Sequence, residues 1–152
     1  MAEKYFVRQV EPGLWQWRLV SGQGQWAGEA YYTGDINLLA ESVASKTCWL
    51  VFDGRKVATR LVDVGVKDRK LLPKLVPYQV EEDIVTPVDN LIFAYGELKD
   101  GVVETAYAVE DEIADQIQAL EDVGAEVESV VVDFIELDSG DGWVIVWDND
   151  RL

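Results

Sequence analysis

Apolar and polar residues alternate along the first part of the chain, which predicts β-strands. The alternation covers residues 5–10 and 14–21, and the turn signal Glu11-Pro12-Gly13 between them indicates a hairpin. A third strand is predicted over residues 25–33. Asp35 then precedes apolar residues at helical spacing, where its side chain suits the N-cap of a short helix.

The middle of the chain combines two strand patterns with a helical one. Residues 48–52 form an uninterrupted apolar run, typical of a strand buried on both faces, and residues 57–66 predict another strand. Apolar residues after Lys67 recur at helical spacing. Because proline disrupts a helix interior, a helix is predicted mainly over residues 77–85, ending before Pro87.

The last third of the chain begins with a second hairpin signal. Strands are predicted over residues 91–98 and 102–109, joined by Lys99-Asp100-Gly101. A helix over residues 110–123, stopped by Gly124, and a strand over residues 127–135 follow. A final strand is expected over residues 143–147. It has no visible pairing successor, which suggests either a truncated chain or a short genuine tail.

These elements predict a mixed α/β fold organised in three units. Residues 1–89 are expected to form a lobe of three strands, helix, two strands and helix. Residues 90–136 are expected to form a small acidic subdomain of hairpin, helix and strand. Residues 137–152 would begin a further lobe.

The net charge of −16 over 152 residues is concentrated near the C-terminus. Residues 1–100 carry 14 acidic and 12 basic side chains, whereas residues 101–150 carry 15 acidic and none basic. This charge repels nucleic acid and anionic lipid, so neither is an expected partner. The acidic residues form either a solvated face attracted to the basic segment 55–74 or a docking surface for a basic partner.

The composition also restricts the chemistry. Without histidine the chain has no Ser-His-Asp triad, Cys-His pair or histidine-containing zinc site. Its one cysteine, Cys48, lies in an apolar strand, which predicts an inert buried thiol and agrees with a cytoplasmic location. No signal peptide or membrane span is expected within these residues.

Three clusters could suggest a site, and each has a simpler structural interpretation. The turn at residues 138–142 offers oxygen ligands but lacks the remainder of a calcium or phosphate loop. Glu81, Glu82 and Asp83 point in different directions on a helix, which favours a solvated face or ion pairs. The tryptophans could form a sugar platform with paired acids, but Trp15, Trp17 and Trp49 fall on strand positions that favour a core. No catalytic residue, cofactor or metal is expected.

Two stretches carry a family resemblance. The first runs from Leu72-Pro73 through Tyr78 and Glu81-Glu82-Asp83-Ile84 to Asn90-Leu91-Ile92-Phe93. The second runs from Ala106-Tyr107-Ala108-Val109 through Leu120-Glu121-Asp122-Val123-Gly124 to Val130-Val131-Val132-Asp133. Both resemble type II secretion system protein L, a bitopic inner-membrane protein with a cytoplasmic domain. Asn90 to Phe93 stands where that family often has histidine and phenylalanine.

The resemblance implies an RNase H or actin-like lobe with an inserted small subdomain of strand, strand, helix and strand. It also implies a membrane span beyond residue 152, so that the chain lies on the cytoplasmic face of the inner membrane. The implied role is a non-catalytic scaffold that recruits the N-terminal domain of the secretion ATPase and couples it to the platform with protein M. A homodimer is left open.

Actin-like relatives from pilus assembly and cell division supply the alternative, a nucleotide-binding assembly protein. Neither Glu11-Pro12-Gly13 nor residues 21–24 show the Asp-x-Gly-Ser/Thr phosphate signature of such ATPases. The working hypothesis is therefore partner docking through acidic side chains. The candidate partner-binding residues are Glu110, Asp111, Glu112, Asp115, Glu121 and Asp122, with Glu81, Glu82 and Asp83.

Overall fold

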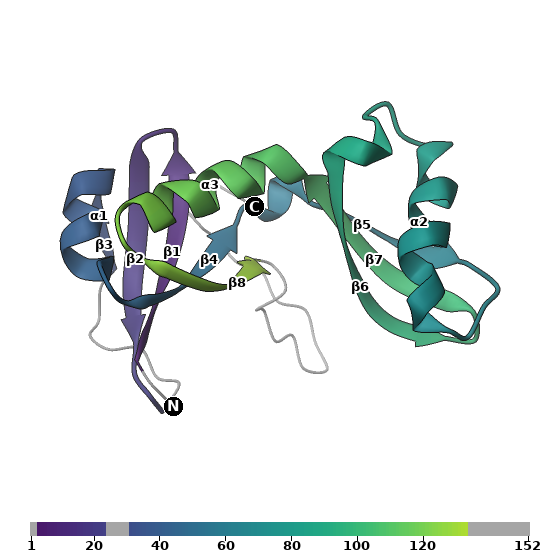
Figure 1. The fold of residues 1–152 in the computed structure, drawn as a ribbon, viewed down its shortest axis with the longest axis horizontal. Helices are drawn as coiled ribbons and strands as arrows, with labels where there is room; N and C mark the ends of the chain where they lie inside the picture. The colour runs from purple at the N-terminus through teal and green to yellow at the C-terminus, as the bar shows by residue number, and fades with distance from the viewer. Residues whose placement is uncertain (1–2, 24–30, 134–152) are drawn as a thin grey trace, which may run out of the picture.

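Two β-sheets organise the computed structural model, which describes residues 3–23 and 31–133 (Figure 1). The first sheet has the strand order β3-β2-β1-β4-β8. Its strands are β1 (Lys4–Glu11), β2 (Leu14–Val20), β3 (Tyr32–Gly34), β4 (Thr47–Phe52) and β8 (Glu126–Val132). With the helices α1 (Ile36–Val43) and α3 (Glu110–Asp122) it forms what we term the first lobe.

The second sheet has the order β5-β7-β6 and is antiparallel throughout. Its strands are β5 (Ala58–Asp63), β6 (Leu91–Lys99) and β7 (Val102–Val109). Helix α2 (Leu72–Glu81) packs on one face of this sheet and completes the second lobe. Short 3-10 turns at Gly54–Lys56, Arg69–Leu71 and Val88–Asn90 link these elements.

The pairing in the first sheet confirms the predicted fold class. Strand β1 pairs antiparallel with β2 and parallel with β4, and β8 extends the sheet parallel to β4. Three consecutive strands in a meander, followed by parallel strands that each return through a helix, give the order of an RNase H or actin-like lobe. The second lobe is inserted between β4 and α3.

The core of the first lobe lies between its sheet and two helices on the same face. Trp15 and Trp17 are buried there beneath Leu39 of α1, and Leu120 of α3 packs into the same cluster. The Trp17 indole N–H donates to the Ser42 hydroxyl at 3.0 Å, so the polar end of this buried side chain is satisfied. These two tryptophans are therefore core residues, as expected.

Strand β4 departs from the prediction that both its faces are buried. Cys48, Leu50 and Phe52 are fully buried on the helix side, whereas Trp49 on the opposite face is only partly buried. There the Trp49 ring stacks on Phe6 with centroids 5.5 Å apart. The apolar run of β4 therefore has two causes. One face of the strand is covered by helices, and on the other face aromatic side chains cover each other.

Helix α2 begins earlier than predicted. It starts at Leu72, with Pro73 in its first turn, and ends at Glu81. Proline is tolerated at the start of a helix because no intrahelical donor is lost there. Pro77 lies inside the helix, and burial of Leu72, Val76 and Val80 against the sheet stabilises the helix despite it. Glu82 and Asp83 consequently lie beyond the helix.

The strand pairing corrects the predicted grouping of residues 90–136. Hairpin β6-β7 pairs with β5 in the second lobe, whereas α3 and β8 belong to the first lobe. The reason is that β8 forms its backbone hydrogen bonds with β4, whose paired residues lie 79 or 80 positions earlier in the sequence, and not with the adjacent hairpin. The acidic charge of residues 110–133 is therefore carried by the first lobe.

Several local predictions are confirmed. The Asp35 side chain accepts from the Leu38 N–H at 2.9 Å as an N-cap. Asp100 and Gly101 both have positive φ, as a two-residue hairpin turn requires. Gly124 follows α3 with φ of 87°, and the N–H groups of Gly124 and Ala125 donate to Glu121 and Leu120.

Some predicted elements fall on residues outside the described ranges. These are most of the third strand, the end of the strand after α3, the turn at residues 138–142 and the strand at residues 143–147. Within the described residues no helix is both long and apolar enough to cross a bilayer.

Candidate protein-interaction sites

Acidic side chains cover the outward face of α3. Asp111, Asp115 and Asp122 are exposed and follow one another at helical spacing together with Gln118, whose side-chain amide donates to Asp122 at 2.8 Å. Glu110 and Glu121 are also exposed and flank this stripe. We term these five carboxylates the acidic face of α3.

The sequence places the acidic face outward because the opposite side of α3 is apolar. Leu120 is fully buried against the first sheet, and Ile113 and Ile117 are partly buried. The three acids in the first turn lie at the positive end of the helix dipole, which favours them by about 0.3–1 kcal/mol each. None of the five carboxylates forms an ion pair with a lysine or arginine of residues 3–23 and 31–133.

Glu112 differs from the other predicted residues of α3. It is only half-exposed, and its carboxylate lies 3.1 Å from the ammonium of Lys56 in the turn after β4. Arg60 of β5 likewise pairs with Asp83 at 2.9 Å. The basic segment thus folds against two of the predicted acids, and among the described residues the intramolecular interpretation accounts for Glu112 and Asp83 alone.

Glu81, Glu82 and Asp83 do not join the acidic face of α3. They lie at the end of α2 in the second lobe, whereas α3 packs on the first sheet. The nine predicted residues therefore form two separate acidic groups, one on each lobe.

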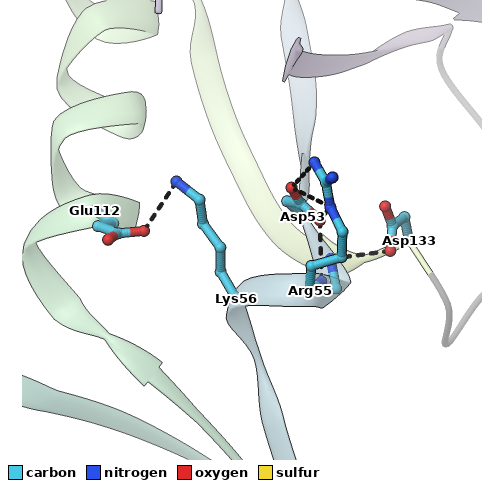
Figure 2. A network of polar contacts seen from close by, with 6 residues as sticks. Asp53, Arg55, Lys56, Glu112 and Asp133 are labelled. Carbon is cyan, nitrogen blue, oxygen red and sulfur yellow. Dashed lines mark hydrogen bonds and ion pairs between the residues drawn. The ribbon is translucent and has the colours of Figure 1, made fainter. Parts of the chain in front are cut away.

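Polar contacts link the two points at which the chain passes from one lobe to the other (Figure 2). The chain enters the second lobe through the turn at Gly54–Lys56, where the Asp53 carboxylate accepts from the backbone N–H and guanidinium of Arg55. Asp133, just after β8, accepts from the Gly54 N–H at 3.0 Å. The pair between Lys56 and Glu112 then joins this turn to the start of α3, where the chain returns.

An apolar cleft of about 260 Å³ lies where the two lobes meet. Its walls come from hairpin β6-β7, from α3, from the turn after β4 and from the ends of β4 and β8. The lining side chains are Phe52, Val57, Ile92, Phe93, Ala94, Ala106, Tyr107, Ala108, Ile113, Ile117, Val130 and Val132. The sequence prediction missed this cleft, because its walls come from segments far apart in the sequence.

Two features of nucleotide- and metal-dependent proteins do not occur in the part of the chain that the structure describes. The β1-β2 turn is a tight turn of Pro12 and Gly13, with Gly13 at φ of 82°, and shows no phosphate-binding loop. No cluster of three or more potential metal ligands occurs within residues 3–23 and 31–133. Cys48 is fully buried, and its burial raises the pKa of the thiol to about 11, as expected for an inert cysteine.

Comparisons with known proteins agree with this architecture. The cytoplasmic domain of EpsL, an inner-membrane component of the type II secretion system of Vibrio cholerae, is 14% identical and superimposes with a TM-score of 0.79 over 91% of this chain. The chain spans 60% of that domain. A PilM-PilN type IV pilus biogenesis complex matches at 15% identity and a TM-score of 0.66, covering 85% of this chain and 47% of that one. No curated protein matches in sequence.

The family comparison covers both lobes. Residues 11–152 match the family described as type II secretion system protein L, which includes the two stretches that carry the resemblance in sequence. The chain therefore belongs to the type II secretion system protein L family.

Proposed function

We propose that this chain is part of a non-catalytic scaffold on the cytoplasmic face of the inner membrane. In this role the acidic face of α3 binds a basic surface of the secretion ATPase, and the scaffold couples that ATPase to a membrane assembly that includes protein M. Membership of the protein L family supports the setting. The observation that carries the docking surface is five exposed carboxylates on one helix without intramolecular ion pairs in the described part of the chain.

The physical reason is electrostatic complementarity. Carboxylates crowded on one helix face repel each other and gain little from the fold, whereas a basic partner neutralises them and is attracted at long range. The attraction between exposed charges is screened beyond about 8 Å at physiological ionic strength, so the complex should weaken as salt is added.

Reversing the charge of Asp111 and Asp115 together is expected to weaken binding of the ATPase N-terminal domain on the order of tenfold or more at low salt. Both side chains are exposed and neither forms an ion pair with a described lysine or arginine, so the fold should be kept. Asp111→Lys with Asp115→Lys avoids Glu112, whose reversal would also break the pair with Lys56. Isothermal titration calorimetry at two salt concentrations measures the effect.

Asp89→Lys with Glu97→Lys is the matched control. These acids are also exposed, but they lie in the second lobe, and the same change in net charge should leave affinity nearly unchanged. Equal loss in both variants would show that overall charge, and not the face of α3, determines binding. Saturable ATP binding with magnesium by the unmodified chain would instead favour the nucleotide-binding alternative.

The apolar cleft offers a second surface for the coupling role. A similar fold occurs in a PilM-PilN type IV pilus biogenesis complex. We propose that the cleft here receives an apolar segment of a membrane-assembly partner such as protein M. Ile92 is partly exposed at the cleft.

Ile92→Asp should abolish co-purification with that partner while retaining ATPase binding, and Leu61→Asp on the same lobe should retain both. Retained co-purification by Ile92→Asp contradicts the cleft assignment.

A further inference from the structure

The outer edge of β8 has no partner strand among the described residues. Strand β8 is the last in the order β3-β2-β1-β4-β8, so its pairing with β4 uses its inner edge alone. Figure 1 shows β8 at the border of the first sheet, with its C-terminal end directed toward the second lobe. An edge of this kind presents a row of backbone N–H and C=O groups that can accept an additional strand.

The other sheet edges of the two lobes carry features that block such pairing. Strand β3 has only three residues. Along β6, the Arg69 guanidinium donates to the carbonyl groups of Gly96 and Tyr95, at 2.6 and 3.4 Å. Strand β5 carries a charged side chain, Arg60, near its centre. Short strands, covered carbonyl groups and charged side chains are common protections against unwanted strand pairing.

The C-terminal half of β8 lacks these protections. Its residues Ser129-Val130-Val131-Val132 carry no charge and include no proline, and three of the four are β-branched valines that favour extended structure. They pair with β4 in regular register, whereas the register shift of β8 lies earlier, at Glu128. A regular, uncharged edge that no described strand pairs is expected to be covered when the protein is at work.

The same edge borders the apolar cleft. Val130 and Val132 both line the cleft, and because side chains alternate between the two faces of a strand, they lie on one face of the sheet. Of the large apolar side chains that line the cleft, Ile92 of β6 and Val130 of β8 are exposed. These two side chains mark the mouth of the cleft, which therefore opens next to the outer edge of β8.

We propose that the occupant of the cleft binds by strand addition: an extended segment of the membrane-assembly partner pairs with the outer edge of β8 at residues 129–132. Directly opposed residues of paired strands share a face, so the partner side chains opposite Val130 and Val132 enter the cleft. The recognised segment is therefore apolar at alternate positions. Its backbone hydrogen bonds supply affinity, and the cleft supplies specificity.

This inference rests on the proposed function of the cleft, to which it adds the mode of binding and the pattern of the recognised sequence. The competing mode is an amphipathic helix laid into the cleft. Such a helix is recognised through apolar residues spaced three and four positions apart, and it needs no free strand edge. The two modes therefore differ in what they require of the partner's backbone.

Methylation of the partner's backbone nitrogens tests the pairing. The probes are overlapping synthetic peptides that together cover protein M, and the tightest binder is methylated at one nitrogen at a time. Successive N–H groups of a strand point to opposite edges. Methylation should therefore weaken binding by about tenfold or more at every second position, and by less than about twofold at the positions between. A bound helix would lose affinity at successive interior positions, because each N–H there bonds within the helix.

Val130→Lys tests the edge on this chain. A lysine at the mouth of the cleft should weaken peptide binding by about tenfold or more in isothermal titration calorimetry, since charged side chains on an edge oppose strand pairing. Val85→Lys is the matched control, because it makes the same change in net charge at an exposed valine of the second lobe and should leave binding unchanged. Circular dichroism of both variants checks that the fold is kept.

The outcomes separate the mode of binding from the site. Strand addition is wrong, and the cleft remains the site, if methylation acts at successive positions or at none while Ile92→Asp still abolishes peptide binding. An affinity that Val130→Lys leaves unchanged also overturns strand addition. If the unmodified chain binds none of the peptides, strand addition and the proposed occupant of the cleft are both wrong.

Discussion

Replacing Leu120 with alanine is expected to lower the free energy of unfolding by about 3 kcal/mol, within the range of about 2–5 kcal/mol for deletion of a buried leucine side chain. Leu120 is fully buried between α3 and the first sheet, in the same cluster as Trp15 and Leu50. Truncation leaves a cavity that the sheet and the closely packed tryptophans can fill only in part.

Leu61→Ala is the matched control, since it deletes the same atoms from a side chain that is 70% exposed on β5. Its effect should stay within about 0.5 kcal/mol. Urea unfolding followed by tryptophan fluorescence measures both variants. If Leu120→Ala unfolds with the stability of the unmodified chain, α3 is not anchored on the first sheet as described.

Cys48 is expected to react with a thiol reagent at pH 8 at least about 100-fold more slowly in the folded chain than in urea. The side chain has no exposed surface, and burial raises the pKa of its thiol to about 11. At pH 8 a thiol of that pKa is ionised in about one molecule in a thousand, against about one in four for an ordinary cysteine of pKa near 8.5. Equal rates with and without urea would contradict the buried position of Cys48.

The same thiol makes stability depend on alkaline pH. The pKa of the thiol is higher in the folded chain than in the unfolded chain. Its contribution to the free energy of unfolding is therefore complete at pH values below the pKa of the unfolded chain, and it is lost as pH rises toward about 11. Burial also raises the pKa of Tyr5 and of Tyr95, which act in the same direction. The difference in pH dependence between the unmodified chain and Cys48→Ala isolates the part due to the thiol, and no difference would contradict it.

Features encoded within a few neighbouring residues could be predicted from the sequence. Asp35 caps its helix, Asp100 and Gly101 close a hairpin, and Gly124 ends α3, because each depends on the local backbone and one side chain. The start of α2 could not be predicted in this way. Its prolines disfavour a helix locally, and tertiary burial of Leu72 and Val76 outweighs that preference.

Contacts between distant segments could not be predicted from the pattern. The sequence makes β8 look like the natural successor of hairpin β6-β7, yet its hydrogen bonds go to β4. The acidic side chains of α3 were predicted to bind a partner, but the ion pair of Glu112 with Lys56 depends on how the two lobes pack against each other. The apolar cleft also depends on how the two lobes pack against each other, so it could be found only in the three-dimensional structure.

The closeness of the two chain crossings makes the second lobe a modular insertion. The chain leaves the first lobe at Gly54–Lys56 and returns at Glu110, and the pair between Lys56 and Glu112 brings these points together. Segments inserted with adjoining ends place little constraint on their host, which is why domain insertion is tolerated at such points. The second lobe can therefore change in size or sequence during evolution, while the strand order of the first lobe is retained.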